Sequence, residues 1–284
     1  MTGLLYLAVA AAIAVTALAV AAALVLRRKN RLLWGQIWGI ESQLTSIRSQ
    51  LLSLEKSALL QSVADARLPA MLPSQHGEDL LAWRFFGGKR AGTFVEAGAF
   101  DGIGFSNTYF LEAMGWHGLL IEPNPVHFES CRKNRPFSTV VHAALDRPGS
   151  PGQTELTIPT SSDSDLEMLA FTNLSETHRR RLGQSPYQSR TVAVPTATLN
   201  ELLEAFRPPL DLLSLDLEGS ELRALEGIDL DLWQPALIVV EDNANSPSGP
   251  LHSYLAAFGY EERLRAGPNL FFARKGDRRS FEAH

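Results

Sequence analysis

The chain has 284 residues, of which 45% are hydrophobic, and carries 26 Lys and Arg against 31 Asp and Glu. The net charge of −5 gives no general attraction to a phosphate backbone, so nucleic acid is not an expected partner. The single cysteine, Cys131, excludes an intrachain disulfide framework and a cysteine-based zinc site. We expect it to pack on a helix.

The N-terminal segment is long and apolar enough to cross a bilayer. No charged residue interrupts the run from Gly3 to Leu26, which exceeds the ~20 residues needed to span a ~30 Å hydrocarbon core. The basic residues follow this run, whereas a cleavable signal peptide would carry them in front of it. Residues 1–31 are therefore predicted to form a single-pass membrane anchor, and the positive-inside rule places the large domain in the cytoplasm.

Residues 32–68 are predicted to form a juxtamembrane amphipathic helix. Its apolar residues recur at the alternating spacings of an a/d seam, at Ile37, Ile40, Leu44, Ile47, Leu51, Leu54 and Ala58. This pattern is typical of a coiled-coil stalk and predicts a homo-oligomer through residues 37–58. A single amphipathic helix on its own domain or on the lipid surface is the alternative. Pro69 then opens the main domain, 69–276, which a polar tail follows at 277–284.

The main domain begins with a predicted helix from Glu78 to Phe86. Polar residues, Gln75, Glu78 and Asp79, surround its start, and the family resemblance given below implies that they contact a ligand cleft. Helix capping is the alternative for the acids, since acidic side chains favour the first turn of a helix. His76 is a candidate base for a substrate hydroxyl, with a packing role as its alternative.

Two apolar strands then run into acidic turns. The segment FVEAGAFDG at 94–102 ends the first strand, and the second ends at Glu122, with a helix predicted over 107–113 between them. Glycine lets the backbone approach a ligand, and the second acid can accept hydrogen bonds from both hydroxyls of a ribose. The turn lacks G-x-G-x-x-G and carries carboxylates where a pyrophosphate would sit. A cationic adenosyl cofactor, S-adenosylmethionine, fits this pattern.

Residues 140–145 are predicted to form a third strand. The stretch 146–190 that follows is polar and weakly periodic, which is typical of functional or mobile insertions. We interpret it as a substrate-facing lid, whose arginines at 179–181 can grip phosphate or carboxylate groups of an acceptor. A solvated helix face is the alternative.

A second chemical centre is predicted at the end of a buried strand over 210–217. Asp216 and Glu218 are two residues apart, so both point to one face while the strand persists. Such a pair can act as general base for an acceptor hydroxyl or can bind a hard divalent cation.

The next strand, 236–243, brings Glu241, Asp242 and Asn243 to the neighbouring edge of the sheet. Asp216, Asp242 and Asn243 are accordingly candidate metal ligands, although no firm metal site is predicted. A helix over 251–258 and a strand over 269–274 complete the domain, with turns at 259–260 and 267–268.

Several blocks of residues, taken in order, resemble the FkbM-type S-adenosylmethionine-dependent methyltransferases. They are SQHGED at 74–79, FVEAGAFDG at 94–102, SNT at 106–108, GWHGLLIEP at 115–123, NRP at 134–136 and LSLDLEGSE at 213–221. The resemblance covers roughly residues 74–275 and implies an α/β fold with a Rossmann-like class I methyltransferase sheet, mostly parallel and doubly wound.

The resemblance also implies roles for individual residues in binding S-adenosylmethionine. Glu122 is expected at the ribose and Ala143 in the wall of the adenine pocket. The methionine side of the cofactor is expected to lie against Glu96, Gly98, Asp101 and Asn107. Asp216 and Glu218 are the expected catalytic carboxylates.

The family implies transfer of a methyl group to oxygen. We therefore expect a membrane-anchored, cytoplasm-facing methyltransferase that O-methylates a hydroxyl of a sugar, glycan or lipid-linked precursor, although N-methylation stays open. A tethered, non-catalytic adaptor or assembly subunit of the same fold is the alternative. An NAD-linked oxidoreductase is disfavoured by the missing G-x-G-x-x-G.

Overall fold

The chain divides into two compact units, Met1–Ser57 and Ala58–His284. The computed structural model describes residues 47, 49–63, 65–160, 188–207, 209–242 and 249–282. The anchor predicted over 1–31, the arginines at 179–181 and Asn243 lie outside the described residues, as do Ile37, Ile40 and Leu44 of the predicted seam. Within the part of the chain that is described, no helix is both long and apolar enough to cross a membrane.

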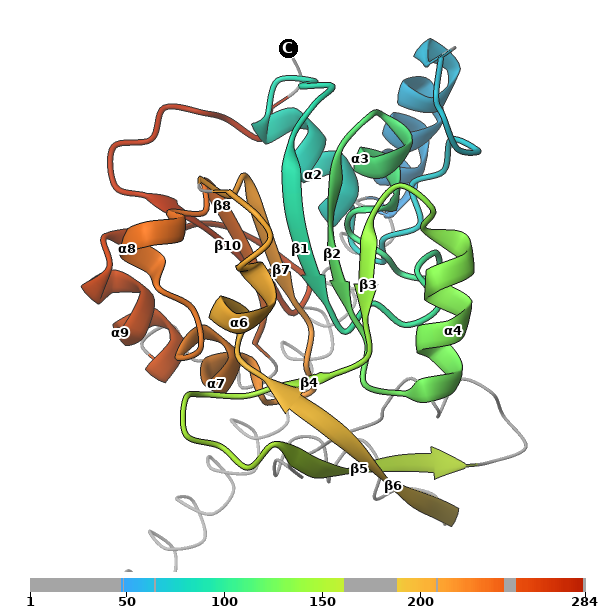
Figure 1. Cartoon of the computed structure of the whole chain (residues 1–284). Coiled ribbons are helices and arrows are strands. Elements are labelled where there is room, and N and C mark those ends of the chain that lie inside the picture. The colour runs from blue at the N-terminus through green and yellow to red at the C-terminus, as the bar shows by residue number, and fades with distance from the viewer. Residues whose placement is uncertain are drawn as a thin grey trace, which may run out of the picture. The chain divides into compact units, whose positions relative to one another are not determined.

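In its described part, the larger unit is built around a seven-stranded, mostly parallel sheet (Figure 1). Its strands are β1 (Thr93–Ala97), β2 (His117–Ile121), β3 (Thr139–Val141), β7 (Leu212–Leu215), β8 (Leu237–Glu241), β9 (Tyr260–Ala266) and β10 (Asn269–Arg274). They lie in the order β3-β2-β1-β7-β8-β10-β9, in which only the pairings of β10 are antiparallel. The Rossmann-like sheet predicted from the sequence is confirmed.

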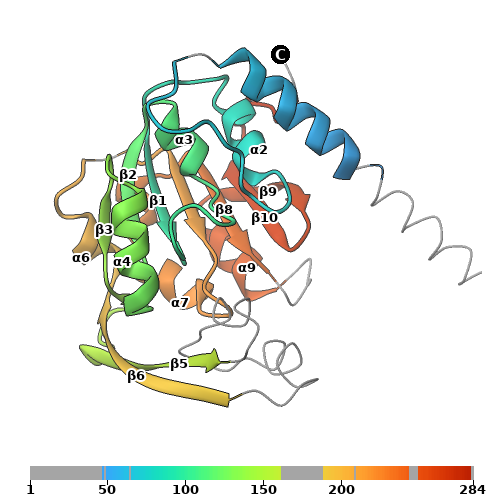
Figure 2. The ribbon, with the colours of Figure 1, turned by 90° about the vertical axis from the view of Figure 1, so that its right-hand side faces the viewer.

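Helices cover both faces of this sheet, because parallel strands need crossover connections. They are α2 (Glu78–Phe85), α3 (Tyr109–Ala113), α4 (Pro125–Asn134), α6 (Leu199–Leu203), α7 (Glu221–Leu225), α8 (Leu230–Trp233) and α9 (Pro250–Ala257). Side chains of α2, α3 and α4 pack with Phe94 and Leu120 on one face, and those of α6 to α9 pack with Val95 and Leu119 on the other (Figures 1 and 2). Cys131 is buried on α4, as predicted, and burial raises its thiol pKa to about 12.

The apolar strands predicted from the sequence are present, with shorter bounds. The central strands β7 and β8 are buried along their whole length, which explains why their sequences, LLSL and LIVVE, are mostly apolar and do not alternate. The strand predicted over 269–274 coincides with β10. The edge strand β9 was not predicted, because an edge strand faces solvent and its EERLR sequence carries no apolar alternation.

A second, small sheet corrects the prediction for residues 140–190. It contains, among the described residues, β4 (Ala144–Leu145), β5 (Gln153–Thr160) and β6 (Gln188–Ala197), in the order β4-β6-β5. The predicted third strand is therefore two strands, β3 and β4, which belong to different sheets. Figures 1 and 2 show β5 and β6 crossing beneath the carboxyl ends of the main strands. The insertion thus begins and ends in two paired strands, β5 and β6, which we call the β-arm, and the lid predicted for it stays a prediction because residues 161–187 lie outside the described residues.

Candidate active site

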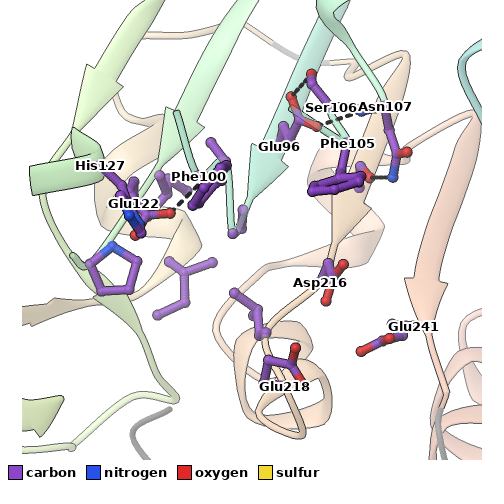
Figure 3. A pocket seen from close by; sticks show the side chains of 18 of the residues that line it. Glu96, Phe100, Phe105, Ser106, Asn107, Glu122, His127, Asp216, Glu218 and Glu241 are labelled. Carbon is purple, nitrogen blue, oxygen red and sulfur yellow. Dashed lines mark hydrogen bonds between the residues drawn. The ribbon is translucent and has the colours of Figure 1, made fainter. Parts of the chain in front are cut away.

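A pocket opens at the carboxyl ends of the parallel strands β1, β2, β7 and β8 (Figure 3). Each strand brings an acid to it: Glu96 from β1, Glu122 after β2, Asp216 after β7 and Glu241 from β8. Ligands of open parallel sheets bind at this edge, where the strand ends leave a crevice.

The charge of the pocket is one-sided. Among the described residues that line it there are five carboxylates and no lysine or arginine, the acids being Glu96, Glu122, Asp216, Glu218 and Glu241. A lining of this kind repels a strongly anionic group such as a pyrophosphate and suits a ligand whose net charge is neutral or positive. It agrees with a cofactor that carries no phosphate.

Glu96 organises the loop that follows β1. Its carboxylate accepts hydrogen bonds from the Ser106 hydroxyl at 2.8 Å, the Thr108 hydroxyl at 2.5 Å and the backbone N–H of Asn107 at 2.7 Å. The Asn107 side chain in turn donates to the hydroxyl of Ser214 on β7 at 3.0 Å. Both predicted residues, Glu96 and Asn107, line the pocket, and the first of them shapes its wall.

Arg135 is a further partner of the Glu96 carboxylate. Its side chain is fully buried and pairs with Glu96 at 3.3 Å and with Glu112 at 2.8 Å, and it donates to the Thr108 hydroxyl at 2.8 Å. We call Glu96, Glu112 and Arg135 the arginine network. Sequence reasoning missed it, since the three residues are far apart in the chain and only the NRP block at 134–136 pointed to this position.

Asp101 fixes the turn rather than the pocket surface. Its Oδ1 accepts the backbone N–H groups of Ile103 at 2.8 Å and Gly104 at 2.7 Å, and the residue is not among those that line the pocket. The role predicted for Asp101 in contacting the cofactor therefore stays a prediction.

Glu122 lies where a ribose-binding acid is expected. Its two carboxylate oxygens accept the backbone N–H groups of Phe100 and Asn124, each at 2.8 Å. Burial raises the pKa of Glu122 to about 7, against the opposing effect of these two hydrogen bonds. Since each carboxylate oxygen has two lone pairs, Glu122 keeps acceptor capacity for ribose hydroxyls.

Gly98 allows β1 and β7 to end side by side. Its φ is +81°, and a Cβ at this position would lie 1.9 Å from the backbone carbonyl oxygen of Asp216. No larger residue fits without moving the two strand ends apart. Gly98 also lines the pocket, as predicted for the methionine side of the cofactor.

The apolar end of the pocket is formed by separate elements. Ala143 lines it together with Leu145 of β4 and Leu156 of β5, so the β-arm contributes to the wall. His127 of α4 packs edge-on against Phe100 with ring centroids 4.3 Å apart. Ala143 lies where an adenine wall was predicted, whereas Leu156 was missed because nothing in the sequence placed β5 near the pocket.

Asp216 is the centre of a group of acids at the other end. Its side chain is accessible from the pocket, yet protein surrounds the carboxyl group. This desolvation, together with the negative charges of Glu241, Glu218 and Glu221, raises the pKa of Asp216 well above its usual 3.8. Carboxylate oxygens of Asp216, Glu221 and Glu241 lie within 4.8 Å of one another, and we call these three residues the acid cluster.

The acid cluster differs from the predicted set of metal ligands. Asp242 is buried but does not line the pocket, so Glu241 of the same strand takes the place expected for it. Glu221, which belongs to the cluster, accepts the N–H groups of Leu217 and Gly219, and burial raises its pKa to about 7.

The geometric argument that paired Asp216 with Glu218 does not hold. β7 ends at Leu215, so the alternation of a strand does not extend to these residues. Glu218 instead lies in a turn with a left-handed φ of 52°. Both carboxylates nevertheless line the pocket.

Of the polar residues around the start of α2, some line the pocket and others do not. Gln75 lines the pocket, whereas Glu78 accepts from the backbone of His76 and from Asn269, and Asp79 accepts from the backbone of Ser74. Both acids lie in the first turn of α2, but no side chain caps the helix at Gly77. His76 does not line the pocket.

Left-handed backbone is concentrated around the pocket. Of the four non-glycine residues with positive φ in the described chain, three line it, namely Phe100, Phe105 and Glu218. Such conformations cost free energy and occur at functional sites, where surrounding contacts hold them in place.

The described residues fit S-adenosylmethionine. Glu122 supplies acceptors for a ribose, the wall around Ala143 is apolar and small, and no cationic side chain reserves space for a phosphate. Strand-end acids complement the positive charge of a sulfonium.

Comparison with known proteins agrees with this geometry. The sequence profile of a family described as Methyltransferase FkbM domain matches residues 96–262. No curated protein matches the chain by sequence.

Solved methyltransferase structures show distant similarity. The METTL16 methyltransferase domain is 12% identical with a TM-score of 0.42, covering 81% of each chain. A TehB-like SAM-dependent methyltransferase from Corynebacterium glutamicum is 12% identical with a TM-score of 0.36, covering 69% of this chain and 88% of that one. The O-methyltransferase from Bacillus cereus is 13% identical with a TM-score of 0.30, covering 80% and 88%.

These TM-scores are too low to support an argument about function, and the family match carries the assignment. It spans more than half of the chain and includes Glu96, Glu122, Asp216 and Glu241. The chain therefore belongs to the FkbM methyltransferase family and is an S-adenosylmethionine-dependent methyltransferase.

Proposed function

We propose that this methyltransferase is anchored in a membrane and O-methylates a hydroxyl group of a sugar, glycan or lipid-linked precursor. The observation that carries the proposal is the position and environment of Asp216, a carboxyl group of raised pKa that faces the cofactor pocket. A base works best when its pKa lies near the operating pH, and an ordinary aspartate is too acidic for this role.

The bound cofactor supplies an electrophilic methyl group on a positively charged sulfur. Asp216 accepts the proton of the acceptor hydroxyl as the oxygen becomes nucleophilic, and Glu218 lies beside it to orient the acceptor. Glu122 holds the ribose, while Glu96 and Asn107 form the wall on the methionine side. The acids at the strand ends complement the positive sulfur.

A divalent cation is a second way in which the acid cluster can activate a hydroxyl. Asp216, Glu221 and Glu241 each offer one oxygen, and hard cations prefer carboxylate ligands. Dependence of turnover on Mg²⁺ separates this arrangement from the metal-free base.

Calorimetric titration of the purified full-length protein tests the cofactor site. We expect S-adenosylmethionine to bind and NAD not to bind, and we expect Glu122→Ala to abolish binding while the protein stays folded by circular dichroism. Turnover is then followed as methyl transfer to hydroxyl compounds, with and without Mg²⁺. Binding without transfer to any acceptor would favour the non-catalytic adaptor instead.

The anchor and stalk belong to the same proposal. The sequence supports a membrane span over residues 1–31, and three a/d residues of the described helix, Ile47, Leu51 and Leu54, are 52%, 54% and 67% exposed. Exposed apolar side chains at this spacing suit a helix that pairs with a second copy.

Membrane fractionation tests the anchor. The full chain should stay in the membrane fraction at high salt, and a chain that lacks residues 1–31 should be soluble and oligomeric by light scattering. A C-terminal reporter should be protected from external protease in intact cells, as a cytoplasmic domain requires. A soluble full chain contradicts the anchor, and a monomeric truncated chain contradicts the stalk.

A further inference from the structure

Phe105 is a solvent-exposed aromatic side chain at the mouth of the pocket. It is 47% exposed, lines the pocket, and belongs to neither of the apolar clusters that cover the main sheet. Figure 3 shows its ring between Asn107 and Asp216, at the end of the pocket away from Glu122. A single exposed Phe is ordinary on a protein surface; this one differs because it lines the pocket and its φ is positive.

The backbone of Phe105 is held in an unfavourable conformation. Its φ is 60°, in the left-handed region that bulky residues avoid. Two carboxylates fix the residues on either side: Asp101 binds the N–H of Gly104, and Glu96 binds the N–H of Asn107. The loop is therefore built to present this ring, because without these bonds the strained residue would relax.

The position of the ring identifies what it contacts. Asp216 is where the acceptor hydroxyl must lie, and Glu122 marks the opposite, ribose end of the pocket. A ring beside Asp216 thus faces the carbon skeleton that carries the reacting hydroxyl. The face of a benzene ring is electron-rich and attracts the weakly positive C–H bonds of a saturated ring.

The charge of the pocket also limits which acceptors can bind. Five carboxylates and no lysine or arginine line it among the described residues, so an anionic group close to the reacting hydroxyl would be repelled. The acid cluster lies on the same side as Phe105. An uncharged acceptor meets none of this repulsion.

We infer that Phe105 is a specificity-determining residue, which stacks on the C–H face of an uncharged, hydroxylated six-membered ring in the acceptor. This inference rests on the proposed transfer to a hydroxyl group and adds the shape and charge of the acceptor. A pyranose is the water-soluble example of such a ring.

Methyl transfer to three probes tests the inference with the full-length protein. Methyl β-D-glucopyranoside offers a closed neutral ring, sorbitol offers hydroxyls without a ring, and methyl β-D-glucuronopyranoside adds a negative charge. The wild type should have its lowest KM for the glucoside. Phe105→Gly should raise that KM about tenfold, towards the value for sorbitol, and should leave the affinity for S-adenosylmethionine unchanged.

Glycine is the informative replacement because it adopts a positive φ without strain. The melting temperature of Phe105→Gly should therefore equal or exceed that of the wild type, so that lost activity is not lost folding. Phe105→Tyr keeps the ring and should keep the low KM.

Three outcomes overturn the inference: equal use of sorbitol and the glucoside by the wild type, preference for the glucuronide, or weaker cofactor binding in Phe105→Gly in proportion to its lost turnover. The last result would assign the ring to the cofactor. Transfer to none of the probes would instead refute the proposed hydroxyl chemistry, and this inference with it.

Discussion

The arginine network and the acid cluster both contain acids from strand ends, yet their surroundings are opposite. In the arginine network, Glu96 and Glu112 share the buried guanidinium of Arg135 and the hydroxyls of neighbouring residues. In the acid cluster, Asp216 has other carboxyl groups as its nearest charged neighbours. In the first arrangement a cation offsets the buried negative charge, whereas in the second the carboxyl groups lie close together and the pKa values of Asp216 and Glu221 are raised.

This difference separates structural acids from reactive ones. A carboxylate that is saturated by an arginine and hydroxyls holds a loop in place and has little capacity left for chemistry. A carboxyl group of raised pKa can exchange a proton near neutral pH. Both kinds line the same pocket, so lining alone does not identify a catalytic residue.

Removing the cation should have the largest effect. Arg135→Met leaves Glu96 and Glu112 buried without their partner, and we expect the free energy of unfolding to fall by ~3–5 kcal/mol. Urea denaturation followed by circular dichroism measures this change. The loop that carries Asn107 should also loosen, so affinity for S-adenosylmethionine should fall in the fraction that stays folded.

Lys89→Met is the matched control for this prediction. Lys89 pairs with Asp211 at 2.7 Å, but the two side chains are 43% and 23% exposed, so its loss should cost less than ~1 kcal/mol. A similar small cost for Arg135→Met would show that the arginine network does not hold the loop.

Removing the base should be the next largest effect. Asp216→Asn should lower kcat by ~10²–10⁴-fold with cofactor affinity unchanged, because the amide cannot accept the proton. The melting temperature should not fall, since one charge leaves a group of like charges. In the wild type kcat should rise with pH as Asp216 loses its proton at its raised pKa.

Asp242→Asn is the control for the base. Asp242 also follows a strand end but is buried and does not line the pocket, so its replacement should leave kcat close to that of the wild type. An equal loss of activity in both variants would instead favour the metal set predicted from the sequence, and a loss of cofactor binding in Asp216→Asn would contradict its assignment as base.

The sequence was sufficient for the parts of the fold that are buried on both faces. Strands such as β7 and β8 are mostly apolar and do not alternate, and their pattern does not depend on what packs against them. The strands β6 and β9 were not predicted, since β6 is mostly exposed and β9 is a partly buried edge strand whose sequence shows no apolar alternation. The division of 140–145 between two sheets depends on tertiary contacts that no local pattern records.

The same limit applies to the site. Glu122 and Asp216 were found because an acid that ends an apolar strand has a fixed place at the edge of a sheet. Arg135 was given no role, because its partner Glu96 comes from a distant part of the chain. Phe105 was missed because its left-handed φ is visible only in the structure.

The pH dependence of stability should be the smallest of these effects. Glu221 has a pKa of about 7 in the folded protein against 4.5 for the free side chain, so the folded state binds its proton more tightly than the unfolded state. Its contribution is fully present below about pH 4.5 and is lost as pH rises through 7, which amounts to about 3 kcal/mol. Urea denaturation between pH 5 and pH 8 should show this fall, and Glu221→Gln should make it shallower. Some dependence of the free energy of unfolding on pH should persist, because the pKa of Glu122 is raised in the same direction.

Glu201→Gln is the control, because it removes an exposed acid whose pKa is lowered. Its free energy of unfolding should depend on pH as that of the wild type does. An unchanged profile for Glu221→Gln would mean that the acid cluster is charged throughout this range and is held by a cation rather than by protons.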